Sequence, residues 1–285
     1  TSAVSTVGSK DLLKTPVANL ATALIGRTPG LTSVQTSGQP GADGITLRIR
    51  GIESPNGSSP LVLVDGVERD FTQLDPNEIE SVSVLKDAAS TAVFGIRGAN
   101  GVMIVTTKKG EEGPAKISIT SNFSIQEPTR LPNMIDAATF CRMYNEALIN
   151  DTPTAKPRFT EDDINKYSSK ENPLEYPNND WFKLILKPSA LQQQHNITIG
   201  GGTKTTKYYS SIGYFTQDGL MRDYSGVLNR RLDNNYRYNR FNLRSNVDVD
   251  VTPTTKVGVM VNGIISQTND PQFNFNGNSS GLLAA

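Results

Sequence analysis

The segment "NRFNLRSNVDVDV" (Asn239–Val251) alternates regularly between apolar and polar residues. Successive side chains of a strand point to opposite faces, so this pattern predicts a long strand with two different faces. One face is apolar and the other consists of Arg240, Asn242, Arg244, Asn246, Asp248 and Asp250. A sheet in a soluble protein and the wall of a membrane barrel both fit such a strand when it is considered alone.

Four further stretches predict strands of the same kind, at about residues 116–126, 195–201, 207–217 and 256–267. Most of them reach the roughly 9–11 residues that a strand needs to cross a bilayer. The connections alternate between long and short: 127–193 and 218–238 are long, whereas "GTKTT" (202–206) and "TPTT" (252–255) are short. This pattern is typical of outer-membrane barrels, which have short periplasmic turns and long external loops.

Five strands alone would leave two open edges in lipid, which a bilayer does not tolerate. Either the sheet is therefore soluble, or the strands are the beginning of a larger barrel, which is the alternative that we favour. Their polar faces are predicted to line its lumen. Tyr208, Tyr209, Tyr214 and Phe215 are candidates for an interfacial aromatic girdle, and ordinary cross-strand packing explains them equally well.

The chain up to about Gly113 has a mixed α/β pattern. A helix is predicted at 15–25, with Thr15 as its cap and Pro16 in its first turn. Short strands are expected near 31–37, 45–51, 61–67, 79–85 and 101–110, with a helix at about 87–94.

The stretch "FGIRGANGV" (Phe94–Val102) resembles a phosphate-binding loop only superficially. Such loops follow a strand and open a helix, whereas these glycines follow the predicted helix and open a strand. We therefore predict a structural corner, with Gly95 as a helix C-cap and Gly98 and Gly101 in turns of positive φ. Arg97 is expected to reach a carboxylate or backbone carbonyl groups.

Composition argues against an enzyme and against nucleic-acid binding. Lys plus Arg (28) balances Asp plus Glu (28), so no net charge attracts nucleic acid. Cys141 and His195 are the only residues of their types, and no nucleophile elbow accompanies His195. We predict no cofactor, no metal and no catalytic residue. Cys141 is expected to be a small buried hydrophobic residue.

Four stretches resemble the SusC/RagA-type TonB-dependent outer-membrane transporters of Bacteroidetes. They are "LIGRTPGLTSVQTSGQPGADGITLRIRGIES" (Leu24–Ser54), "PLVLVDGV" (Pro60–Val67), "LDPNEIESVSVLKDAASTAVFGIRGANGVMIVTTKKG" (Leu74–Gly110) and "QQHNITIGGGTKTTKYYSSIGYFTQDGLM" (Gln193–Met221). The resemblance implies an α+β plug domain at 1–113, followed at 114–285 by antiparallel strands of an outer-membrane β-barrel that is incomplete in this chain. It also implies a long external segment at 127–193.

The same resemblance implies import of a nutrient across the bacterial outer membrane, usually a glycan and sometimes a peptide. The implied partners are a SusD-like surface lipoprotein, outer-membrane lipid and the TonB–ExbB–ExbD system, which would act through an N-terminal segment absent from this chain. An alternative, from the residues alone, is a soluble β-rich binding or adhesion module with an α/β cap.

Polar contacts are expected to hold the plug inside the barrel. Three plug arginines are the candidates, namely Arg48, Arg50 and Arg97. Their expected partners are carboxylates such as Asp248 and Asp250 of the wall, or Asp65 and Asp87 of the plug itself, in which case the contacts only stabilise the plug. The loop "IESPNGSSP" (52–60) is a candidate for touching substrate.

Overall fold

The computed structural model describes residues 4–14, 17, 19–35, 37–49, 59–223 and 235–270. The chain divides into two compact units. The first unit contains the described parts of 1–126, 190–219 and 235–270, and the second contains those of 127–189 and 220–234.

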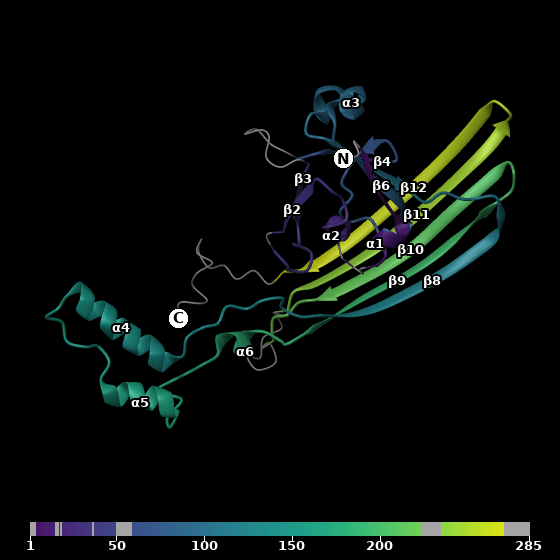
Figure 1. Cartoon of the computed structure of the whole chain (residues 1–285). Coiled ribbons are helices and arrows are strands. Elements are labelled where there is room, and N and C mark those ends of the chain that lie inside the picture. Colours follow the sequence, from purple (N-terminus) through teal and green to yellow (C-terminus); the bar gives the residue numbers. More distant parts are fainter. Residues whose placement is uncertain are drawn as a thin grey trace. The chain divides into compact units, whose positions relative to one another are not determined.

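The N-terminal body of the first unit, residues 4–109, is built on a five-stranded sheet in the order β1-β6-β7-β4-β5. Figure 1 labels β4 and β6 of this sheet. Its strands are β1 (Val4–Gly8), β4 (Leu61–Val64), β5 (Val67–Glu68), β6 (Ile79–Leu85) and β7 (Val102–Thr107). The pair β4 and β7 is parallel, and the other neighbours are antiparallel. A separate antiparallel pair joins β2 (Leu31–Gln35) to β3 (Ile45–Ile49).

The core of this body is apolar and well buried. Its members include Leu12, Leu20, Leu24, Leu74, Ile79, Val82, Val84, Met103 and Val105. The strand residues Val82, Val84, Met103 and Val105 pair across β6 and β7 and therefore lie on one face of the sheet. Two short helices, α1 (Ser9–Leu12) and α2 (Leu20–Leu24), contribute Leu12, Leu20 and Leu24. Burying each leucine contributes about 1.5–3 kcal/mol, so this core stabilises the body independently of its polar surface.

The helix predicted at 15–25 is shorter than expected. The residue that caps α2 is Asn19, whose side chain accepts a hydrogen bond from the backbone N–H of Ala21 (2.9 Å). An extended backbone at Asn19 (φ −112°, ψ 123°) prevents the helix from beginning earlier. Thr15 and Pro16 lie outside the described residues.

The glycine-rich corner comprises α3 (Ala88–Thr91) and a 3₁₀ segment, η2 (Ala92–Gly98). Gly95 (φ 59°, ψ −146°) is non-helical and separates two helical segments, so it lies where the first segment ends, as predicted. Gly101 has the predicted positive φ (90°), but Gly98 does not. A Cβ at Gly98 would lie 2.9 Å from the carbonyl oxygen of Thr91. Close backbone approach, not a left-handed conformation, therefore requires a glycine at Gly98.

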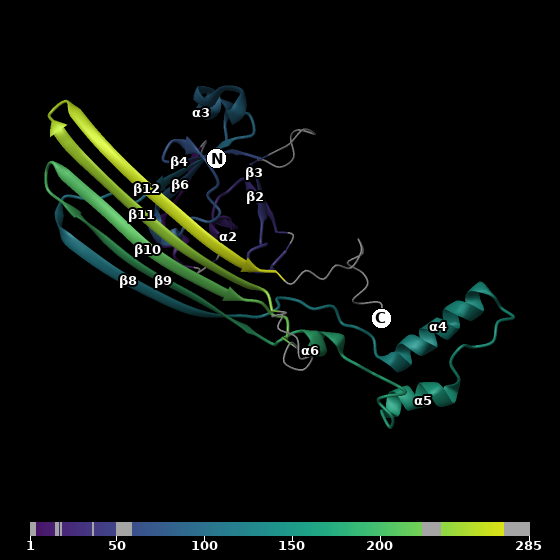
Figure 2. The ribbon, with the colours of Figure 1, turned by 180° about the vertical axis from the view of Figure 1, so that it is seen from behind.

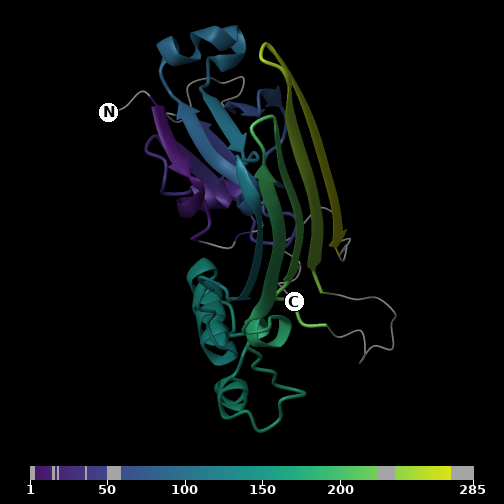
Figure 3. The same cartoon turned by 90° about the vertical axis from the view of Figure 1, so that its right-hand side faces the viewer.

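The second sheet of the first unit has five long antiparallel strands in the order β12-β11-β10-β9-β8 (Figures 1 and 2). Its strands are β8 (Gly113–Gln126), β9 (Ala190–Gly202), β10 (Thr206–Asp218), β11 (Arg237–Thr252) and β12 (Thr255–Asn269). This sheet is called the wall below. Figure 3 shows the N-terminal body beside one face of the wall.

The two faces of the wall differ in polarity, row by row. One row across the strands consists of Ile119, Ile197, Ile212 and Leu243, whose exposed fractions are 75, 49, 58 and 49%. The adjacent row points to the opposite face and consists of Thr120, Asn196, Gly213 and Asn242. An apolar surface this regular is exposed on one side only, as in a barrel wall that faces hydrocarbon.

The four aromatic residues of β10 do not form one girdle. Tyr214 is on the apolar face, where its ring contacts those of His195 and Phe241 (centroid distances 6.3 and 4.7 Å). Tyr209 and Phe215 are buried on the other face (7 and 1% exposed). The prediction of a common girdle for all four is therefore wrong, because adjacent residues of a strand point in opposite directions.

The second unit contains three helices among its described residues: α4 (Ala137–Asp151), α5 (Glu161–Ser169) and α6 (Trp181–Ile185). The predicted cap of α5 is present as a capping box between Thr160 and Asp163. Cys141 is buried against Ala138 and Ile164, as predicted. No helix in the described ranges is long and apolar enough to span a bilayer.

Candidate functional site

The inner face of the wall is an array of buried polar side chains. It includes Gln192, Gln194, Asn196, Ser211, Arg240, Asn242, Arg244 and Asn246, all less than 5% exposed. Buried polar groups cost free energy unless they are hydrogen-bonded. Three segments of the N-terminal body supply partners: the β4–β5 turn, the 73–78 turn and the end of β7.

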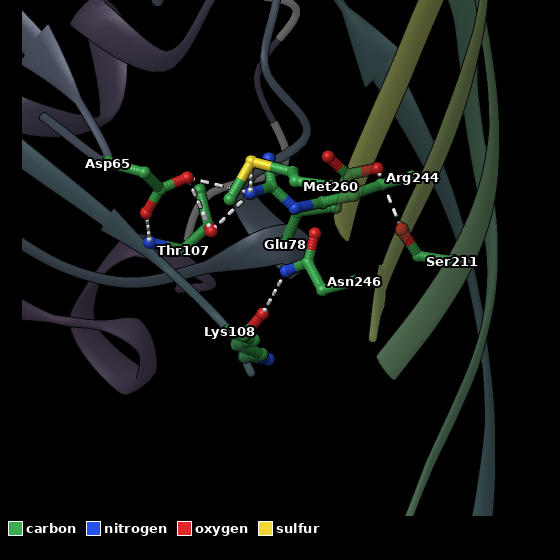
Figure 4. A network of polar contacts seen from close by, with 8 residues as sticks. All are labelled: Asp65, Glu78, Thr107, Lys108, Ser211, Arg244, Asn246 and Met260. Carbon is green, nitrogen blue, oxygen red and sulfur yellow. Dashed lines mark hydrogen bonds and ion pairs between the residues drawn. The ribbon is translucent and has the colours of Figure 1, made fainter. Parts of the chain in front are cut away.

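The first contact is an ion pair between Arg244 of β11 and Asp65, the residue that follows β4 (Figure 4). The Nη2 atom of Arg244 lies 2.7 Å from Oδ2 of Asp65, and the arginine side chain is fully buried. Thr107 donates to Asp65 from its backbone N–H (3.0 Å) and its hydroxyl (2.8 Å), and its hydroxyl oxygen also accepts from Arg244. Burial raises the pKa of Asp65, but the hydrogen bonds from Thr107 and Arg244 outweigh it and hold that pKa below its ordinary value.

The second contact is centred on Asp75, which caps the 3₁₀ turn η1 (Pro76–Glu78). Its carboxylate accepts hydrogen bonds from the backbone and side chain of Asn77 (2.8 and 2.9 Å). The wall adds the side-chain amides of Gln194 (3.2 Å) and Asn196 (3.3 Å). A Cβ at Gly213 would lie 2.8 Å from Oδ2 of Asp75, so the glycine leaves the space that this carboxylate occupies.

The third contact is made by Glu78 at the end of the same turn. Its Oε1 accepts a hydrogen bond from the hydroxyl of Ser211 (2.9 Å), and the residue is 1% exposed (Figure 4). Burial, together with the nearby charge of Asp75, raises the pKa of Glu78 to about 7. This carboxyl group therefore changes its charge near neutral pH.

Two asparagines of β11 donate to backbone carbonyl groups of the N-terminal body. Asn242 reaches the carbonyl of Gln73 and Asn246 that of Lys108, each at 3.0 Å. Between them along β11, Arg244 binds Asp65. The inward-facing residues of one strand thus contact three separate segments of the body.

The predicted site residues fall into two groups. The structure brings Asp65 together with Arg244, and it places Asn242 and Asn246 at the same interface. Arg240, the remaining inward residue of the group, donates from Nε to Asn242 (2.9 Å) and lies over the ring of Phe215.

The other predicted residues lie elsewhere. Arg97 pairs with Glu68 inside the N-terminal body (2.7 Å), and Asp250 pairs with Lys256 inside the wall (3.3 Å). The remaining positions are Arg48 on β3, Asp87 before α3 and an exposed Asp248 beside Gly258. Arg50 and residues 51–58 of the candidate substrate loop lie outside the described residues.

The sequence did not predict that three residues take part in this interface: Asp75, Glu78 and Ser211. The "LDPNE" stretch (Leu74–Glu78) predicts a turn, because Asp before Pro is a strong turn signal. Two carboxylates in a turn ordinarily face water, and nothing local indicates that these two are buried. In the described ranges no group of three or more His, Cys, Asp or Glu is arranged to hold a metal ion.

Comparison with known proteins identifies the family to which this chain is similar. Residues 1–102 match the model of the TonB-dependent Receptor Plug Domain. The chain is 35% identical over 271 residues to a TonB-dependent receptor of Formosa agariphila, an alignment that covers 92% of this chain and 25% of the relative. It is 30% identical over 234 residues to the TonB-dependent receptor SusC of Bacteroides thetaiotaomicron, which covers 78% of this chain and 21% of SusC.

A solved structure of the RagAB peptide importer, in its closed-closed state, superposes with a TM-score of 0.75 at 29% identity. The match covers 98% of this chain and 33% of that one. The chain belongs to the SusC/RagA type of TonB-dependent receptors. The N-terminal body is the plug-like α/β region, the antiparallel wall does not close into a barrel within this chain, and the protein is located in the outer membrane.

The chain spans about a quarter of the length of the curated relatives that it matches. The interface described above lies between the plug-like N-terminal body and the wall strands that this chain contains. Within this interface, the plug presents carboxylates and backbone carbonyls, and the wall presents the donors.

Removing either partner of the buried ion pair should release the plug more easily. We expect Arg244→Ala or Asp65→Ala to weaken plug attachment by about 3–5 kcal/mol, because each leaves a buried charge unpaired. The measurement is the urea concentration at which the intact protein, reconstituted in a planar bilayer, becomes conducting.

A matched control is available in the plug. The Arg97–Glu68 pair has the same 2.7 Å separation, but its side chains are 70 and 56% exposed. Glu68→Gln should leave the urea threshold almost unchanged, because solvent screens an exposed pair. Equal effects of Glu68→Gln and Asp65→Ala would contradict the importance assigned to the buried pair.

Gly213→Ala should displace Asp75 from the wall. The added methyl group would overlap the carboxylate, and overpacking of this kind costs about 1–3 kcal/mol. Gly263→Ala is the control, since a Cβ there lies an ordinary 4.0 Å from Leu243. Only Gly213→Ala should lower the urea threshold for conductance. Equal thresholds for the two variants would contradict the close approach of Asp75 to Gly213.

Proposed function

We propose that this chain supplies the plug and the first wall strands of an active importer of organic nutrients across the outer membrane. The observation that carries this proposal is the wall–plug interface, which consists of hydrogen bonds and one buried ion pair. The substrate class that we favour is a glycan or oligosaccharide, with peptides as the alternative. RagAB, which is similar to this chain, is described as a peptide importer.

The chemistry of the interface suits a plug that must be held firmly and yet moved. A hydrogen bond contributes only about 1 kcal/mol net, because water replaces it when it breaks. The contacts at Asp65, Asp75 and Lys108 belong to different plug segments. A mechanical pull on the plug would therefore break them one after another, and each broken contact would be solvated by water in the lumen.

The proposed organisation has the plug at 1–113 and the wall at 114–285, with an external segment at 127–193. The start of β8 at Gly113 and of β9 at Ala190 supports these limits. We further propose that a SusD-like lipoprotein presents the substrate and that TonB–ExbB–ExbD supplies the pull. The protein is proposed to act without covalent chemistry. The exposed apolar row of the wall argues against the alternative of a soluble adhesion module.

Tethering the plug to the wall should abolish import. A Cβ at Gly41 would lie 2.7 Å from Oγ1 of Thr268 on β12, so Gly41→Cys with Thr268→Cys places two thiols within bonding range. Cys141, the only cysteine of this chain, is buried and will not compete. The measurement is uptake of labelled oligosaccharides and peptides by cells, before and after a membrane-permeant reductant.

We expect the double variant to import nothing when oxidised and to recover when reduced. Each single variant is the control for the strain of a side chain at Gly41, whose φ is 76°. A strain lacking the gene identifies which of the two substrate classes is imported. If uptake is undiminished while the disulfide bridge is fully formed, the plug does not need to separate from the wall during import, and the proposal is wrong.

A further inference from the structure

Glu78 differs from the other carboxylates of the interface in how poorly it is hydrogen-bonded. Among the described residues, its carboxyl group accepts a hydrogen bond only from Ser211. Asp75, in the same turn, accepts from Asn77, Gln194 and Asn196. A buried carboxylate needs several donors to remain ionised at low cost. Glu78 is as deeply buried as Asp75 but lacks a comparable set of hydrogen-bond donors.

The charges around Glu78 do not compensate for this shortage. Asp75 repels its negative charge from within the turn, whereas Arg240 and Arg244 attract it from β11. Two further groups face it, namely Arg69 of the plug, which favours its ionised form, and the buried Tyr209 of β10, which is neutral. Lys108 donates from its backbone N–H to the backbone carbonyl of Glu78 (2.8 Å), and its side chain interacts electrostatically with Asp75. Burial remains the largest influence on this carboxyl group.

We propose that Glu78 makes attachment of the plug depend on pH: a proton on this carboxyl group tightens the contact with the wall, and its loss loosens the contact. The inference rests on the proposed role of the wall–plug interface in import. It adds a positioning residue that senses pH inside that interface. When the carboxyl group is neutral, it occupies its buried site beside Asp75 without the cost of desolvating a charge.

The direction follows from linkage. Glu78 has a pKa of about 7 against the wall and an ordinary value of 4.5 in water. An acid whose pKa is raised in the assembled state stabilises that state fully below the lower value. This stabilisation is lost as pH rises between the two values, and it is absent above about pH 7.5. The opening equilibrium should therefore rise on the order of 50-fold between pH 5 and pH 8.

Such a plug would be held more tightly in acidic surroundings and would release more readily at neutral pH. Glu78 lies on the same turn as Asp75. When Glu78 loses its proton, the two carboxylates repel each other, and the contacts of both residues with the wall are weakened. Ordinary carboxylates and lysines do not titrate between pH 5.5 and 7.5. A dependence on pH in this window that Glu78→Gln abolishes is consequently the signature of the proposal.

The experiment compares the urea threshold for conductance of the intact protein in planar bilayers between pH 5 and pH 8. The wild type should show the rise in opening given above, and Glu78→Gln should remove it, because an amide does not titrate. Glu80→Gln is the control, since Glu80 lies two residues along β6 and is exposed. This variant should keep the wild-type pH dependence.

Ser211→Ala provides a second test that does not alter the carboxyl group. Loss of its hydrogen bond to the ionised form should move the upper end of the pH dependence to higher pH. The proposal is overturned if the urea threshold of Glu78→Gln still depends on pH as in the wild type. It is also overturned if Ser211→Ala does not shift this pH dependence to higher pH. Neither measurement requires substrate or the energy-coupling partner, so failure here is distinguishable from failure of the proposed import function.

Discussion

The structure depends on one constraint, namely that each wall strand separates two environments that are one residue apart along the chain. Outward residues such as Ile212 and Leu243 are exposed and apolar, as contact with hydrocarbon requires. Their inward neighbours, Ser211 and Arg244, are polar and almost fully buried. The plug is the material that buries them, and its surface must therefore offer hydrogen-bonding partners to the wall.

This constraint explains why the plug has an apolar core and a polar anchor. Leucines and valines stabilise its sheet from within, whereas carboxylates at Asp65 and Asp75 project from turns toward the wall. Glycines adjust the fit where backbones and side chains meet closely, as Gly213 does opposite Asp75. Attachment of the plug can consequently be weakened without unfolding it, because the two sets of interactions share few residues.

Much of the wall and little of the interface could be predicted from the sequence. Alternation assigned Arg240 through Asn246 to the inner face, because side-chain direction in a strand is a local property. It assigned Asp248 to the same face, and this residue is exposed. Alternation does not predict burial, since burial depends on how far the plug extends. Asp75 and Glu78 were predicted only as parts of a turn. Their partners lie more than a hundred residues away in sequence, and no local pattern encodes that contact.

The most direct test of a wall that divides hydrocarbon from plug uses two adjacent residues of β10. In the reconstituted protein, Ile212→Cys should react with a membrane-soluble maleimide and not with a water-soluble one. Ser211→Cys should react with neither reagent until urea releases the plug, and then with the water-soluble reagent. Labelling of Ser211→Cys from water while the plug is in place, or of Ile212→Cys from water at any stage, would contradict the account.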